Sequence, residues 1–179
     1  LVRGYIAGGD NALRKSMERA EDIFEDGEND ILLSGATQND VIVGISASGR
    51  APYVCGVLSK GKELGCKTIA LTCNKQAKMA IYVDIHIAPE VGPEAITGSS
   101  RMKAGTAHKM VLNMLTSGSM IMIGKTYHNY MIDMLPTNTK LIDRATRIIQ
   151  KIAEIDYQTA SEYLKKADNK VKTAVVMAV

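Results

Sequence analysis

The chain has 179 residues, of which 46% are hydrophobic and 23% charged, a composition typical of a soluble globular protein with a sizeable core. The net charge is only +3, the basic residues form no run and there is a single Phe, so a nucleic-acid partner is not predicted. Three cysteines without a CxxC pair favour a reducing compartment, and they argue against a disulfide framework and a zinc site.

The first 27 residues contain a weak strand candidate, VRGYIA at 2–7, and a predicted helix at 11–27. Four apolar residues recur at the 4-3-4 spacing of a buried helical stripe: Leu13, Met17, Ala20 and Phe24. On such a helix Glu21 lies about 70° from the centre of the stripe, which predicts a half-buried carboxylate. Partial burial raises the proton affinity of a carboxylate and suits it to acid–base chemistry, although a purely structural role is the alternative.

Three short apolar runs predict buried strands: VIVGI (41–45), TIALT (68–72) and VDIHIA (83–88). The first two runs are continuous enough for a sheet that is covered on both faces. Between them, Pro52 suits the first position of a helix and Gly65 suits its end. A strand, a helix and a strand within about 30 residues predict a right-handed βαβ unit, and therefore an α/β fold with a parallel sheet.

A polar turn, SASGR at 46–50, follows the first predicted strand and precedes the helix. Ligands of such sheets bind beyond the carboxyl ends of the strands. Ser46 and Ser48 offer hydroxyls, Gly49 lets the backbone approach closely, and Arg50 completes a candidate anion site at the start of a helix. The alternative is an ordinary polar turn with a capping serine, and the motif is neither a Walker A loop nor a GxGxxG fingerprint.

A second hydroxyl-rich segment, TGSSRMKAGT at 97–106, precedes a predicted long helix capped by Ser99 or Ser100. Basic residues in a first helical turn oppose the helix dipole, which points to an anionic neighbour, and the alternative is a well-capped helix with a solvated basic first turn. The candidate binding residues of this region are Glu94, Thr97, Ser99, Ser100 and Lys103. The helix continues into the apolar stretch 110–124, which is too short and too interrupted for a membrane span of about 20 residues and is predicted to be buried in the core.

The histidines at 86, 108 and 128 show no metal-ligand spacing, and structural roles are predicted for them. From Thr137 onward, spaced Ile and Leu among Lys, Glu and Ala predict a small helical bundle with a break at Asp156.

Four long segments together resemble the N-acetylmuramic acid 6-phosphate etherase family: GISASGRAPYV, LGCKTIALTCN, VGPEAITGSSRMKAGTAHKMVLNML and GKTYHNYMIDMLPTNTKL. This family belongs to the sugar isomerase (SIS) fold group and is similar to the vertebrate glucokinase regulatory protein. The stretch VGPEAITGSSRMKAGT distinguishes the etherases from sugar-phosphate isomerase domains.

The resemblance implies a three-layer α/β/α SIS domain with a parallel sheet at 1–136, lacking its N-terminal part, and an incomplete helical C-terminal domain at 137–179. It also implies a cytoplasmic homodimer that uses no metal or organic cofactor and whose partner is a small-molecule sugar phosphate. The expected reaction cleaves the D-lactyl ether of N-acetylmuramic acid 6-phosphate, giving N-acetylglucosamine 6-phosphate and D-lactate. Bacteria use this reaction in cell-wall recycling and amino sugar catabolism.

In this chemistry a base removes the C2 proton of the open-chain sugar, and an acid assists the departure of lactate. The family carries one catalytic glutamate in an E-x-A-E-D pattern, which matches residues 18–22 and assigns that role to Glu21. Its second catalytic glutamate and a glycine-rich TSGR turn lie upstream of Leu1 in relatives. The resemblance therefore predicts that these residues are the middle of a longer protein and are inactive alone.

One position departs from the family pattern, because Ala51 stands where SIS loops commonly carry a threonine. Losing one neutral hydrogen bond costs about 1 kcal/mol, or a factor of about five in affinity. Two other functions remain open on the sequence, a non-catalytic sugar-phosphate-binding regulatory module and a sugar-phosphate isomerase.

Overall fold

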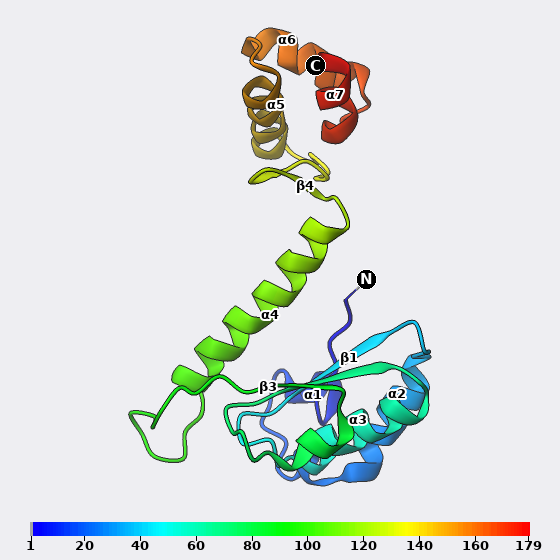
Figure 1. Ribbon diagram of the computed structural model, residues 1–179, viewed down its shortest axis with the longest axis vertical. Coiled ribbons are helices and arrows are strands. Elements are labelled where there is room, and N and C mark those ends of the chain that lie inside the picture. The colour runs from blue at the N-terminus through cyan, green and yellow to red at the C-terminus, as the bar shows by residue number, and fades with distance from the viewer. Residues whose placement is uncertain (1) are drawn as a thin grey trace. The chain divides into compact units, whose positions relative to one another are not determined.

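A computed structural model describes residues 2–179, which form two compact units that meet between Leu112 and Asn113 in the sequence (Figure 1). The first unit contains these elements: α1 (Gly9–Ala12), the 3-10 helix η1 (Ala20–Asp22), α2 (Phe24–Ser34), β1 (Val41–Ile45), α3 (Pro52–Glu63), β2 (Lys67–Leu71), the 3-10 helix η2 (Lys78–Tyr82) and β3 (Ile85–Ile87). Helix α4 (Lys103–Met122) begins in the first unit and ends in the second. The second unit continues with β4 (Thr126–Tyr127), β5 (Tyr130–Met131), α5 (Thr139–Ala153), α6 (Tyr157–Lys166) and α7 (Val171–Ala178).

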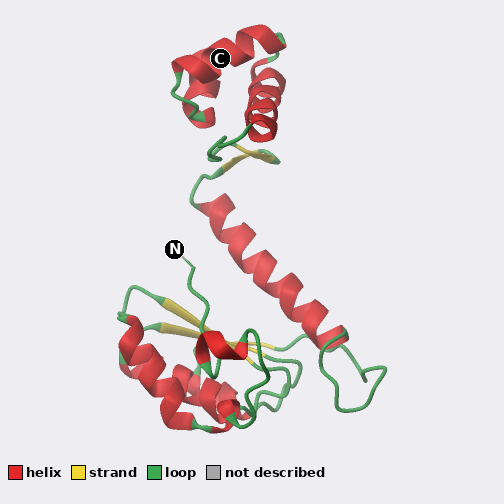
Figure 2. Cartoon of the chain, turned by 180° about the vertical axis from the view of Figure 1, so that it is seen from behind, coloured by secondary structure: helices red, strands yellow, loops and turns green. Residues whose placement is uncertain are grey.

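The sheet of the first unit has the order β1-β2-β3, and both pairs are parallel (Figure 2). Ile42 lies opposite Thr68, and Ile69 lies opposite Ile85. Helix α3 begins at Pro52 in its first turn, and the chain leaves it through Gly65, whose φ is +81°. The predicted strands, the βαβ unit and the α/β class are confirmed.

Helix α3 packs tightly on one face of this sheet and on α2. Leu58 is fully buried, and a Cβ added to Gly44 of β1 would lie 2.7 Å from its Cδ1 atom. Tyr53 donates a hydrogen bond from its hydroxyl to the Asp30 carboxylate of α2 at 2.6 Å. Burial and this carboxylate raise the pKa of Tyr53 well above its usual range. The core of the first unit therefore lies between α2, α3 and this face of the sheet.

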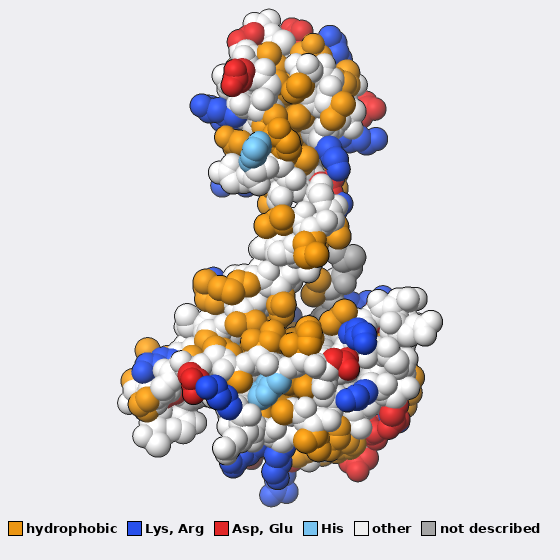
Figure 3. All heavy atoms as spheres, in the orientation of Figure 1, with side chains coloured by type: hydrophobic (Ala, Val, Ile, Leu, Met, Phe, Trp, Pro, Cys, Tyr) orange, Lys and Arg blue, Asp and Glu red, His pale blue; other side chains and the backbone are white. Residues whose placement is uncertain are grey.

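The opposite face of the sheet is apolar but open, contrary to the prediction that both faces are covered. Val41 is 60% exposed and Ile85 is 54% exposed. A continuous apolar run shows that both faces of a strand are apolar, but it does not specify what covers each one. Helix α4 corrects a second prediction of burial, because Met114 is 64% exposed and only Ala104 and His108 of this helix are buried. Hydrophobic side chains lie on the surface of this helix (Figure 3).

The N-terminal region differs most from expectation. Residues 2–7 form no strand, and the helix predicted at 11–27 does not form, because α1 ends at Ala12 and Arg19 has a φ of +66°. Leu13 of the predicted stripe is 69% exposed. The buried residues of α2 are instead Gly27 and Ile31, one turn apart, since this face packs against α3. Packing against α3 thus decides which residues become helical.

The second unit is a small helical bundle with its own core, as predicted. Ile149, Leu164 and Val171 of α5, α6 and α7 are almost completely buried. The predicted break at Asp156 is confirmed, because its carboxylate accepts the Thr159 N–H at 3.0 Å and so caps α6. The domain boundary predicted at 136/137 lies between β5 and α5, inside this unit, and it stays a prediction. Within residues 2–179 we find no helix whose length and hydropathy would let it span a bilayer.

Candidate functional site

The SASGR loop connects β1 to α3 at the carboxyl edge of the sheet, as predicted. Its turn is closed by the Gly49 N–H, which donates to the Ser46 carbonyl at 3.0 Å and to the Ser46 hydroxyl at 3.1 Å. Gly49 is buried and has a φ of +66°, whereas Ser48 and Arg50 are exposed. Neither the hydroxyl nor the N–H of Ser48 has a hydrogen-bond partner among residues 2–179. The loop therefore presents unpaired donors.

The start of α3 adds further donors to this loop. Its N-cap residue is Ala51, and no side chain accepts a hydrogen bond from the first turn. The loop is thus not a turn capped by a serine, which was the alternative interpretation. Uncapped N–H groups at a helix start, together with the dipole, attract an anion. A serine hydroxyl that accepts one hydrogen bond can still donate its own proton, so Ser46 remains a candidate donor beside Ser48.

Glu21 lies in η1, directly before α2. Its side chain is exposed, which corrects the prediction of a half-buried carboxylate. The prediction failed because it assumed one helix through 11–27, and the backbone at Arg19 interrupts that periodicity. Glu21 therefore lies in a short 3-10 turn just before α2, and not at the edge of the buried face of a long helix.

Glu94 caps α4 with both oxygens of its carboxylate. One oxygen accepts the Lys103 N–H at 3.0 Å, and the other accepts the Ala104 N–H at 3.1 Å. The cap predicted at Ser99 or Ser100 is therefore wrong, because the helix begins later and a residue nine positions upstream occupies its first turn. These two N–H groups hold the pKa of Glu94 below its usual value.

The remaining candidates of this segment lie on the loop before α4 and at the first residue of α4. Thr97 and Ser100 are exposed, and the half-buried Ser99 donates its N–H to the Ile96 carbonyl at 3.1 Å. The Lys103 ammonium donates to the Pro93 carbonyl at 2.8 Å. Glu94 and Lys103 therefore tie the two ends of this loop together, and the hydroxyls between them have no partner among the described residues.

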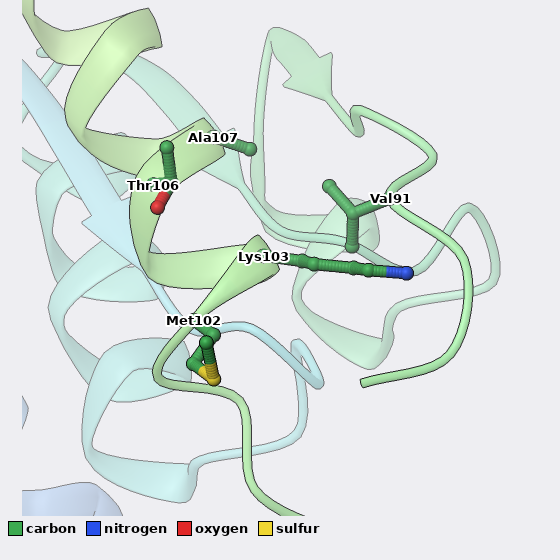
Figure 4. A pocket seen from close by; sticks show the side chains of 5 residues that line it. All are labelled: Val91, Met102, Lys103, Thr106 and Ala107. Carbon is green, nitrogen blue, oxygen red and sulfur yellow. The ribbon is translucent and has the colours of Figure 1, made fainter. Parts of the chain in front are cut away.

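An open hollow of about 650 Å³ lies beside the start of α4 (Figure 4). Its lining residues are Val91, Met102, Lys103, Thr106 and Ala107. Figure 4 shows Lys103 extended beneath Val91. Lys103 is the one predicted binding residue that lines it, and the SASGR loop does not contribute. The polar chemistry for an anion is concentrated at that loop, so we place the phosphate candidate there and not in the hollow.

Sequence reasoning missed the residues that follow β2. The buried Thr72 hydroxyl lies 2.9 Å from Nε2 of His86, and Sγ of Cys73 lies 3.4 Å from Nε2 of His108, which is 8% exposed. Burial and the negative charge of Glu94 raise the pKa of the Cys73 thiol, so this pair offers no activated nucleophile. The SASGR loop was predicted because ligands of such sheets bind beyond the carboxyl ends of the strands. The same argument also applies to Thr72 and Cys73, because β2 ends at the same edge of the sheet as β1.

Replacing Glu94 by glutamine tests the cap of α4. The pKa of this carboxyl is lower in the folded protein than in the unfolded chain, where it is about 4.3. The carboxylate therefore stabilises the fold fully at a pH above the unfolded-state pKa, and this contribution is lost as the pH falls through the folded-state pKa. We expect Glu94→Gln to lower the unfolding temperature by about 2–4 °C at pH 7. The difference should vanish near pH 2, and a difference that persists there would contradict the assignment. Glu90→Gln, an exposed glutamate of the preceding loop, is the control.

Known proteins resemble the chain both in parts and over nearly its whole length. Residues 1–62 match the model of the glucokinase regulatory protein N-terminal SIS domain, and residues 128–176 match the C-terminal lid domain of glucokinase regulatory protein. The N-acetylmuramic acid 6-phosphate etherase of Oceanobacillus iheyensis is 49% identical over 99% of the chain, and that of Shouchella clausii is 46% identical over the same share. That of Salmonella paratyphi B is 48% identical.

The similarity extends over nearly every residue of the chain, and it includes the SASGR loop, the region of Glu21 and the segment that leads into α4. The chain spans 60% of the length of these three relatives. Over nearly its whole length, the chain is therefore similar to the N-acetylmuramic acid 6-phosphate etherases.

Proposed function

We propose that the protein carrying this chain cleaves the D-lactyl ether of N-acetylmuramic acid 6-phosphate, giving N-acetylglucosamine 6-phosphate and D-lactate. The observation that carries this proposal is the 46–49% identity to etherases over 99% of the chain. The protein is then a carbon–oxygen lyase of peptidoglycan recycling and amino sugar catabolism, and its small-molecule partner is a sugar phosphate.

The phosphate of the substrate binds at the SASGR loop in this proposal. Ser46 and Ser48 donate from their hydroxyls, Gly49 allows the close approach, and Arg50 supplies a positive charge. The unpaired donors of the loop and the uncapped start of α3 support this assignment. Three residues of the loop before α4 and the first residue of α4 contact the sugar or complete the anion site: Thr97, Ser99, Ser100 and Lys103. Glu94 supports them through its cap of α4.

The reaction proceeds by elimination and then addition of water. A base removes the C2 proton of the open-chain aldehyde, the C3–O bond breaks, and an acid protonates the departing lactyl oxygen. Water then adds to the unsaturated aldehyde, with its hydroxyl at C3 and its proton at C2. Glu21 is one of the two proton-transfer groups. Its exposure in η1 leaves its carboxylate accessible to a substrate. The proposed reaction uses no metal or organic cofactor.

Replacing Glu21 by alanine in the full-length protein is expected to reduce D-lactate release by about 100-fold or more, because general acid–base groups contribute 10²–10⁴-fold. Release is followed with a D-lactate dehydrogenase assay. Glu18→Ala, which removes an exposed glutamate three residues away, should retain activity close to that of the wild type. Undiminished release by Glu21→Ala would exclude the assigned role.

The division into an SIS domain at 1–136 and a helical domain at 137–179 is part of the same proposal, as are a homodimeric state and a cytoplasmic location. The exposed methionines of α4, such as Met114, support a partner subunit. Three free cysteines, two of them buried, support a reducing compartment. Sedimentation of the full-length protein tests the dimer, and a monomeric species at micromolar concentration would exclude it.

The matched domain models of glucokinase regulatory protein favour a second candidate, a non-catalytic sugar-phosphate-binding module. This candidate requires binding of N-acetylmuramic acid 6-phosphate without D-lactate release. The similarity to etherases argues against it. Interconversion of an aldose and a ketose phosphate without lactate would instead identify an isomerase. The lactate assay with wild-type protein separates the three.

A further inference from the structure

Three successive carbonyl groups of the SASGR loop accept hydrogen bonds from the neighbouring segment 73–79. The Ala47 carbonyl accepts the Cys73 N–H at 2.9 Å. The Gly49 carbonyl accepts the Met79 N–H at 3.2 Å. The Ser48 carbonyl between them accepts from a side chain, the amide Nδ2 of Asn74, also at 3.2 Å. The segment after β2 therefore holds the three central carbonyl groups of the loop.

This arrangement dictates where the N–H groups of the loop point. The described residues contain no cis peptide, and in a trans peptide the C=O and the following N–H point in opposite directions. The N–H groups of Ser48, Gly49 and Arg50 are therefore directed away from segment 73–79. The Gly49 N–H closes the turn on Ser46, while those of Ser48 and Arg50 have no partner among residues 2–179. The two free N–H groups thus flank that of Gly49, and successive N–H groups in a turn form a concave site for an anion.

Asn74 is the one side chain among the three donors, and its own orientation is fixed. Its Oδ1 atom accepts the Gln76 N–H at 3.0 Å, which leaves Nδ2 to face Ser48. Its backbone is held by the fully buried Thr72 hydroxyl, which accepts the Asn74 N–H at 3.1 Å and donates to the Asn74 carbonyl at 2.9 Å. The amide group thus reaches Ser48 from a rigid support.

We propose that Asn74 is a positioning residue for phosphate binding, which holds the Ser48–Gly49 peptide through the Ser48 carbonyl and thereby orients the free N–H groups on either side of that peptide, those of Ser48 and Arg50, toward the phosphate. This inference rests on the proposed sugar-phosphate site. Asn74 contacts no substrate in this role, and it orients the peptide that links Ser48 to Gly49. That peptide is then held at both ends, by Asn74 at its oxygen and by Ser46 at its nitrogen.

The test uses the full-length protein and two variants of Asn74. Asn74→Ala removes both side-chain hydrogen bonds, whereas Asn74→Asp keeps the acceptor for the Gln76 N–H and loses the donor to Ser48. The matched controls are Gln76→Ala and Gln76→Glu, because Gln76 lies in the same loop, is exposed, and makes its hydrogen bond through its backbone N–H. Gln76→Glu also measures the effect of an added negative charge on phosphate binding.

We expect Asn74→Ala to weaken binding of inorganic phosphate about fivefold, the equivalent of one neutral hydrogen bond. In Asn74→Ala, the KM for D-lactate release should rise by a similar factor, while kcat changes less than twofold. The unfolding temperature of Asn74→Asp should stay near that of the wild type. Asn74→Asp should bind phosphate more weakly than Gln76→Glu does.

A role of Asn74 in the turn alone predicts that Asn74→Asp binds phosphate as well as Gln76→Glu, and that result would overturn the proposal. An unchanged phosphate affinity in Asn74→Ala would also overturn it. If wild-type protein binds phosphate but releases no D-lactate, the proposed function fails, and the phosphate titrations still decide the role of Asn74. If wild-type protein binds no phosphate, the positioning role is overturned as well.

Discussion

Replacing Gly49 by alanine is expected to impair phosphate binding at the SASGR loop more than any other glycine-to-alanine substitution in the first unit. An added Cβ would lie 2.3 Å from the Ala77 Cβ and 3.0 Å from Cγ2 of Thr72, and the φ of +66° is strained for any residue with a side chain. Strain and overpacking together should cost about 2–4 kcal/mol of unfolding free energy. Phosphate affinity should fall at least about tenfold, since the loop must move away from segment 73–79.

Two matched variants isolate the causes. Gly35→Ala introduces a methyl at a φ of +72° with no atom within 4 Å, so its cost measures the strain of the backbone alone. Combining Gly49→Ala with Ala77→Gly removes the nearest obstructing atom and should restore part of the loss. Urea unfolding and titration with inorganic phosphate provide the measurements. Equal costs for Gly49→Ala and Gly35→Ala would show that the contact with Ala77 is unimportant.

The second large effect is expected from Gly56→Ala, which forces α2 away from α3. An added Cβ at Gly56 would lie 2.0 Å from the carbonyl oxygen of Phe24, and one at Gly27 would lie 2.0 Å from the carbonyl oxygen of Tyr53. The obstructing atoms belong to the backbone, so no side-chain rotation relieves the contact. We expect a loss of about 3 kcal/mol or more in unfolding free energy, a size that points to disruption of the core.

Gly118→Ala is the matched control for this prediction. Gly118 lies inside α4 with no atom within 4 Å of an added Cβ, so alanine there should stabilise the helix by up to about 1 kcal/mol. Urea unfolding compares the two variants, and a Gly56→Ala protein as stable as the wild type would refute the close contact. The same variant should also lower D-lactate release in the full-length protein, because η1 with Glu21 directly precedes the displaced α2.

Local patterns predicted the part of the site that depends on local chemistry. An apolar run, two hydroxyls, a proline and a later glycine are enough to place the SASGR loop between a strand and a helix. The same reasoning failed for Glu21, because a 4-3-4 spacing is also compatible with a chain that is not one helix. It failed again at α4, where the capping group is Glu94, nine residues from the helix start, and not a neighbouring serine.

The sequence by itself determined the βαβ unit, the position of the SASGR loop and the similarity of the chain to the etherases. These features depend on residues that are neighbours along the chain, or on similarity that extends over nearly all of it. The tertiary structure decided where α2 begins, which group caps α4 and how the SASGR loop is held. Each of these depends on contacts between residues distant in sequence, such as the approach of Gly56 to Phe24 and the hydrogen bond from Asn74 to Ser48. A periodic pattern carries no information about such contacts, because it records the faces of an element and not the partner that each face meets.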